Sequence, residues 1–233
     1  GFNLKNKGLI EDVKVAGSVT GNNDVAGIVN KIDEDGKIEN VAFVGKINSV
    51  GNNSTVGGIA GSNYMGFVNR AYVDATITAQ NANASMLVPF VTYMLNSWKS
   101  GTKAKVTNSV AKGVLDVKNT RNVGGIVAKT WPYGAVQDNV TYAKVIKGQE
   151  IFASNDVNDE DGGPYIKDLF GVVGYSSAED GTGKDTKSPK KLKHLTKKEA
   201  DKRVEGYKIT ADTFVSEPYA LNTLNNVSSQ ADF

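Results

Sequence analysis

The stretch Ala26-Gly27-Ile28-Val29-Asn30 decides the fold, because close variants of it return along the chain. A small residue, a glycine and two apolar residues recur as Gly57-Gly58-Ile59-Ala60-Gly61, as Gly124-Gly125-Ile126-Val127-Ala128 and as Phe170-Gly171-Val172-Val173-Gly174. The spacing is loose, roughly thirty residues at first and longer later, which is typical of a fold that stacks one supersecondary unit.

An apolar strand with an Asx-type residue near its start precedes each glycine stretch. It reads Ile10-Glu11-Asp12-Val13-Lys14-Val15 first, and it returns from Ile38, Val68, Val106 and Val136. Apolar residues alternate within these strands, which directs one face inward and one outward. We expect one residue from each of four of these five copies to share a corner of the stack, either as a simple turn residue or as part of an amide ladder. This corner series is Asp12, Asn40, Asn108 and Asp138.

Composition supports strands and tight turns over helices. The 233 residues include 25 Gly and 5 Pro, and 39% are hydrophobic. We predict an all-β chain that forms a right-handed parallel β-helix-like solenoid of about five coils with a short C-terminal helical extension. The expected domains are a β-helical repeat domain over 1–178, a linker over 179–191, and a short helical or extended segment over 192–233.

Charge and cysteine content exclude several classes of protein. The formal net charge is only +2, so no global field favours nucleic acid or a membrane surface. The absence of cysteine removes disulfide scaffolds and thiolate zinc sites. No apolar run is long enough to span a bilayer, so we expect no membrane insertion. The chain starts at Gly1 without a Met, and we expect it to be a piece of a longer protein.

A helix is predicted over residues 197–205, after the linker. Thr196 and Glu199 match a capping box, and Leu195 with Ala200 fits a hydrophobic staple. Gly206 is suited to end this helix. The basic residues from Lys184 to Arg203 lack interleaved aromatics, so we interpret them as a solvated face rather than a nucleic-acid site.

The small-Gly-apolar-apolar unit, spaced by strands of the type Ile-x-Asn-Val, resembles the GLUG repeats. These repeats lie upstream of the catalytic domain in the immunoglobulin A protease family of streptococcal zinc metallopeptidases. The resemblance covers residues 8–176 and rests on the four glycine stretches and the strands before them.

The resemblance implies a parent protein that is secreted or attached to the cell wall and that carries zinc in a His-Glu-x-x-His catalytic domain. This chain has a single histidine, His194, so that motif is absent from it. The resemblance therefore implies a non-catalytic middle region, with no catalytic or metal residue of its own. Its expected partners are other domains of the parent protease and host immunoglobulin A. An adhesin stalk without a protease, or a β-helical carbohydrate-active enzyme, would use the same repeat, although clustered groove carboxylates for the latter are lacking.

Two breaks in the repeat are rich in aromatic residues. The third copy replaces the glycine stretch with an apolar run around Pro89, and Trp131 follows the fourth. Each is either an apolar loop or short helix packed over a coil, or a surface that contacts another domain or a substrate. The residues of this candidate surface are Met86, Phe90, Tyr93, Trp98, Trp131 and Tyr133.

Two further motifs are weak. The acidic run from Asp156 to Gly162 resembles a calcium loop, but its glycine is one place late and Lys167 stands where a Glu is required, so we interpret it as a solvated loop. Gly174-Tyr175-Ser176-Ser177-Ala178 nearly matches a nucleophile elbow but lacks the helical pattern that should follow it.

Overall fold

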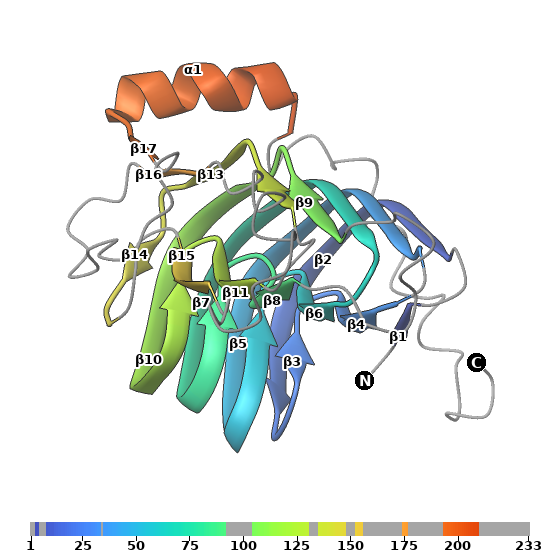
Figure 1. Cartoon of the computed structure of the whole chain (residues 1–233), viewed down its shortest axis with the longest axis vertical. Coiled ribbons are helices and arrows are strands. Elements are labelled where there is room, and N and C mark those ends of the chain that lie inside the picture. The colour runs from blue at the N-terminus through green and yellow to red at the C-terminus, as the bar shows by residue number, and fades with distance from the viewer. Residues whose placement is uncertain are drawn as a thin grey trace, which may run out of the picture.

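The chain folds into a β-solenoid of about four turns, which confirms the predicted all-β class (Figure 1). The computed structural model describes residues 3–4, 8–33, 35–91, 104–130, 135–147, 152–155, 174–176 and 193–209. Each full turn contributes one long strand to a large parallel sheet. These long strands are β2 (Leu9–Gly21), β5 (Lys37–Gly57), β7 (Phe67–Ser85) and β10 (Val110–Gly124).

Short strands form a second parallel sheet that closes the turns. In stacking order they are β1 (Asn3–Leu4), β4 (Val29–Ile32), β6 (Ala60–Asn63), β8 (Phe90–Val91), β11 (Val127–Thr130) and β15 (Phe152–Asn155). The remaining strands all join the large sheet. They are β3 (Val25–Ala26), β9 (Lys105–Thr107), β12 (Ala135–Gln137), β13 (Asn139–Thr141), β14 (Lys144–Val145), β16 (Gly174–Ser176) and β17 (Lys193–His194).

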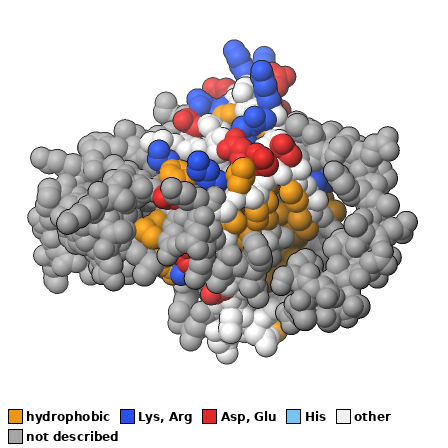
Figure 2. Space-filling model, turned by 90° about the vertical axis from the view of Figure 1, so that its right-hand side faces the viewer, with side chains coloured by type: hydrophobic (Ala, Val, Ile, Leu, Met, Phe, Trp, Pro, Cys, Tyr) orange, Lys and Arg blue, Asp and Glu red, His pale blue; other side chains and the backbone are white. Residues whose placement is uncertain are grey.

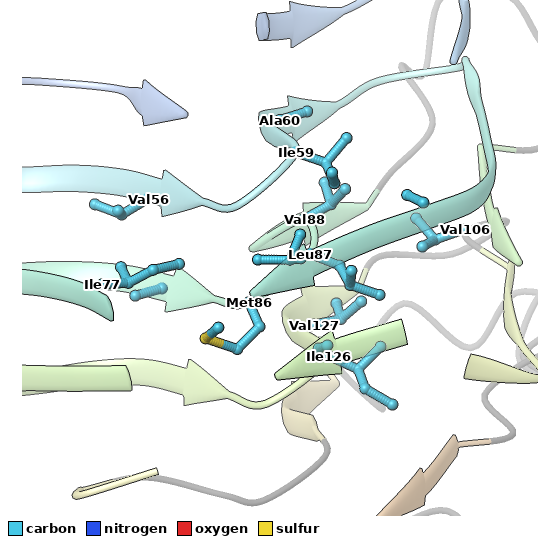
Figure 3. Close-up of a cluster of buried hydrophobic side chains, with 14 of the residues drawn as sticks. Val56, Ile59, Ala60, Ile77, Met86, Leu87, Val88, Val106, Ile126 and Val127 are labelled. Carbon is cyan, nitrogen blue, oxygen red and sulfur yellow. The ribbon is translucent and has the colours of Figure 1, made fainter. Parts of the chain in front are cut away.

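The core consists of aliphatic columns, because the register places like residues above one another. Ile47 pairs in register with Ile77, and Ile77 with Leu115. All three side chains are at most 1% exposed. Between the two sheets, side chains of successive turns meet around Leu87 and Val88 (Figure 3). Burial of such columns supplies the main stabilisation of a solenoid.

The third glycine stretch is not interrupted at Pro89, so that expectation is wrong. Ser85 pairs with Gly57, and Val91 pairs with Asn63, so the connecting segments of the two turns have equal length. Met86 therefore occupies the glycine position, and its carbonyl accepts a hydrogen bond from the Gly58 N–H at 3.1 Å. Pro89 lies between β7 and β8, where its missing N–H breaks no ladder of the long strands.

Another strand holds the position that was expected for the last glycine stretch. β15 pairs with β11 and so takes the place in the fifth layer that we assigned to Phe170–Gly174. Gly174 instead pairs with Asn139, in the large sheet. Residues 170–173 lie outside the described residues.

The corner series does stack, and every member is left-handed. Asp12, Asn40, Asn108 and Asp138 have φ between 50° and 54°, and the Asn40 amide donates to the Asp12 carboxylate. Asx residues tolerate this conformation at low cost. The third turn differs, because Arg70 holds the corner there with φ 54°.

The predicted helix is present as α1 (Lys197–Tyr207), with the Thr196–Glu199 capping box formed. Gly206 lies inside the helix rather than ending it, and Lys208 takes the left-handed cap conformation. Within the described ranges, no helix is long and apolar enough to cross a membrane.

Candidate interaction surfaces

The structure separates the residues of the predicted aromatic surface. Met86 is fully buried in the core and cannot form part of a surface, because its position faces the inside of the turn. Phe90 is half-buried. Tyr93, Trp98, Trp131 and Tyr133 lie outside the described residues, so the rest of this surface stays a prediction.

Phe90 belongs to a small cluster on the short-strand sheet. Its ring lies 5.5 Å from the ring of Tyr64, at an interplanar angle of 58°. The Lys31 ammonium lies 4.3 Å from the Tyr64 ring centroid and pairs with Asp33 at 3.0 Å. Burial raises the pKa of Tyr64 above its ordinary value, so the phenol remains neutral at physiological pH. This cluster combines an aromatic contact with the Lys31 cation, a composition that is common at protein interfaces.

A groove crosses the outer face of β5, β7 and β9. Its first wall is a column formed by Lys37, Phe67 and Lys105, which pair in register. Its second wall is the column of Glu39, Asn69 and Thr107, two positions further along the same strands. A cavity of about 600 Å³ opens between these columns. It is lined by Asp35, Lys37, Ile38, Glu39, Phe67, Val68, Asn69, Lys105 and Thr107.

Polar side chains of the second wall bond across the turns. The side-chain amide of Asn69 donates to the Glu39 carboxylate at 2.8 Å, and the Thr107 hydroxyl donates to the side-chain oxygen Oδ1 of Asn69 at 2.9 Å. On the first wall, the Lys105 ammonium lies 5.7 Å from the Phe67 ring centroid. The lining residues offer charged, amide, hydroxyl and aromatic groups that can contact a polar partner.

Helix α1 packs across the corner of the solenoid. Ala200 is fully buried against Val140, with Leu195, Val204 and Tyr207 packed around them. Just after the helix, Ile209 is fully buried in a cluster with Ala42 and Tyr72. The helix therefore covers the outer face of several turns at once, as its position above the sheet in Figure 1 also shows.

Polar contacts fix the direction of the helix. The Arg203 guanidinium lies 3.6 Å from the carboxylate of the corner residue Asp138. The Tyr142 hydroxyl donates to Asp201 at 2.9 Å. Arg70 donates to the Lys208 carbonyl at 3.1 Å, which gives the negative end of the helix a cation that its own last turn lacks. This contact gives Arg70 a role at a corner that Asx residues hold in the other turns.

Ionisation follows from these contacts. The hydrogen bonds from Lys197 and then Tyr142 lower the pKa of Asp201 below its ordinary value. Burial, followed by the Asp201 hydrogen bond, raises the pKa of Tyr142. The capping hydrogen bonds from Thr196 lower the pKa of Glu199. The carboxylates of Glu199 and Asp201 are thus charged at neutral pH.

Sequence reasoning missed both the groove and the role of Arg70. The groove has no motif, because its walls come from register between turns. Arg70 did carry a signal, since it is a non-Asx residue in an otherwise Asx corner series.

The ranges that the structure describes contain no group of three or more His, Cys, Asp or Glu residues that could hold a metal ion. The acidic run from Asp156 to Gly162 lies outside those ranges.

Comparison with known proteins identifies two relatives in Streptococcus pneumoniae serotype 4. The chain is 48% identical over 225 residues to the zinc metalloprotease ZmpB, a match that covers 95% of this chain and 12% of ZmpB. It is 31% identical over 164 residues to the zinc metalloprotease ZmpC, covering 66% of this chain and 8% of ZmpC.

No family model matches the chain, so the GLUG resemblance stays a prediction. No solved structure matches it either. The chain spans about an eighth or less of the length of the curated relatives it matches. It is therefore a homologue of one segment of the streptococcal zinc metalloproteases ZmpB and ZmpC.

Proposed function

We propose that this chain is a non-catalytic segment of a secreted or cell-wall-attached zinc metalloprotease resembling the immunoglobulin A proteases. Its solenoid positions a protein substrate, or contacts the catalytic region, while zinc is held elsewhere in the parent protein. The observation that carries this proposal is the match to ZmpB, because nearly the whole chain aligns with a small part of a metalloprotease.

The chemistry of the chain supports a binding role. A His-Glu-x-x-His site needs two imidazoles one helical turn apart, and the sequence supplies one histidine. The groove between the Lys37 and Glu39 columns instead presents both charges, amide groups and an aromatic ring in a cavity of about 600 Å³. Such a set suits recognition of an extended polar segment of a partner protein.

Binding of the purified chain to immunoglobulin A and to the catalytic region of the parent tests the proposal. We expect a measurable affinity for at least one of them, weakened by the double substitution Lys37→Glu and Lys105→Glu in the groove. The substitution Lys118→Glu is the control, because Lys118 is exposed on β10 and does not line the groove. If the chain binds neither protein, the interaction role is wrong.

The parent gene discriminates between this proposal and the adhesin stalk. A His-Glu-x-x-His motif downstream of this segment would support the protease. A gene that lacks this motif would favour the stalk.

A further inference from the structure

The strand β1 lies where a solenoid turn ends, not where one begins. Asn3 pairs in register with Lys31, and Leu4 pairs with Ile32, at the end of β4. Leu4 is 6% exposed, so it is packed like the residue that closes a turn. The next four strands of this sheet, β4, β6, β8 and β11, each follow a long strand of the large sheet, β2, β5, β7 and β10.

The inward-facing side chains of β2 are incompletely covered. Val13 is 36% exposed, whereas Val41, its partner in β5, is 0% exposed. Ile10, Val15 and Val19 are likewise only partly buried, although their partners Ile38, Phe43 and Ile47 are at most 1% exposed. Figure 2 views the molecule from the side on which β2 lies in Figure 1, and it shows hydrophobic side chains gathered on this face, beside acidic ones.

The backbone at this end also follows the pattern of a stacked turn. The N–H groups of Lys37, Phe67 and Lys105 each donate to a carbonyl of the turn before, at 2.8 to 2.9 Å. Leu9 holds the same register position in β2, so its N–H is directed toward the end of the solenoid.

Gly17 and Gly45, which pair in register further along β2 and β5, show that the β2 end of the solenoid is open. Gly45 has φ +149°, and a Cβ there would lie 1.9 Å from the carbonyl oxygen of Gly17, in the turn before. Gly17 pairs with Gly45 and has the same φ, but nothing lies within 4 Å of the corresponding position. The space that preceding backbone fills at Gly45 is therefore open at Gly17.

We propose that the β2 end of the solenoid is an interface for one more solenoid turn, supplied by the polypeptide that precedes this segment in its parent. That turn pairs in parallel with β2, covers Ile10, Val13, Val15 and Val19 with aliphatic side chains, and ends in β1. Continuity with the β2–β5 stacking argues for this occupant, because β1 already holds the end of such a turn. The rival occupant is a second copy of the chain that pairs along the same edge. The proposal does not depend on the proposed function.

A chain with one added turn tests the proposal. A copy of residues 8–30 replaces Gly1 and Phe2 directly ahead of Asn3, which preserves the register of Asn3 with Lys31. The chain contains no cysteine, so Val13→Cys in the original β2 gives a unique thiol. Its rate of alkylation by a maleimide is compared with that in a chain carrying the same added residues in scrambled order. The substitution Val50→Cys is the control, since Val50 is 51% exposed on β5, one turn away from the interface.

We expect the added native-order turn to slow alkylation at position 13 by about tenfold or more, because the thiol then reacts only after local opening. Alkylation at position 50 should be equal in both chains. Equal rates at position 13 in the native-order and scrambled chains would overturn the proposal. A dimer of the original chain by sedimentation, with slow alkylation at position 13, would also overturn it in favour of a second copy.

Discussion

At the scale of single residues, stacked backbones determine where a side chain is tolerated. Gly45 and Gly17 share one conformation and one register column, but only Gly45 has a carbonyl 1.9 Å from its Cβ position. Gly17→Ala should lower the free energy of unfolding by about 1–3 kcal/mol, because it adds only backbone strain. Gly45→Ala should lower the free energy of unfolding by about 1–3 kcal/mol more, because its new Cβ would force the two turns apart. Urea unfolding of the two variants measures the difference, and equal losses would show that the turns are not in contact at this column.

Met86 gives a second prediction at this scale. Its side chain is fully buried at the glycine position of the third turn, so Met86→Ala should lower the free energy of unfolding by about 2–5 kcal/mol. Phe90→Ala should cost less, since Phe90 is only half-buried. Denaturant unfolding tests both variants. Unchanged stability in Met86→Ala would contradict the burial of this side chain in the core.

At the scale of elements, helix α1 depends on its first turn. The Thr196 hydroxyl accepts from the Glu199 N–H, and Glu199 accepts from the Thr196 N–H at 2.8 Å. Thr196→Ala removes this cap and should destabilise the helix by about 1 kcal/mol. Faster amide exchange in residues 197–207, with β5 and β7 unchanged, is the expected result. The control is Thr196→Ser, which keeps the hydroxyl and should behave like the native chain.

Acid should loosen the same helix. The pKa of Asp201 is lowered in the folded chain, so the charged carboxylate favours folding above the ordinary value of 3.8, and this contribution is lost as the pH falls through the lowered pKa. Lys197→Ala removes the largest cause and should raise the pKa of Asp201 toward its ordinary value. Tyr142→Phe should raise it by less. An NMR titration of the side-chain carboxyl measures both shifts. The Glu199 carboxyl is the internal control, because Thr196 holds its pKa down, and an unchanged Asp201 in both variants would contradict these contacts.

The elements that could be predicted are those that one local pattern specifies. The capping box located α1 to within two residues, and the Asx series located the corners. The end of the helix was misplaced, because Lys208 adopts the left-handed cap conformation that we assigned to Gly206. The third glycine stretch was also misplaced, and β15 holds the position that was expected for the last one. Register between distant strands positions these segments, and Met86 is fully buried where the neighbouring turn has Gly58.

At the scale of the whole molecule, the sequence predicted the architecture but not the surfaces. The repeat indicates parallel stacking, and about four turns are present where about five were expected. The right-handed winding stays a prediction. The groove arises from columns that run across turns, so no contiguous stretch of sequence encodes it. The contact between α1 and the solenoid likewise joins residues such as Arg70 and Lys208, which are far apart in the sequence.

We propose, as the central point, that this solenoid serves a protease without performing its chemistry. The most direct test compares the complete parent protease with a variant that lacks this segment, using a short peptide across the scissile bond and intact immunoglobulin A. We predict that kcat/KM for the peptide is unchanged, while kcat/KM for the intact protein falls by about tenfold or more because remote binding contacts are lost. Loss of both activities with zinc still bound would place the segment in the catalytic machinery, and retention of both would remove its role in positioning the substrate.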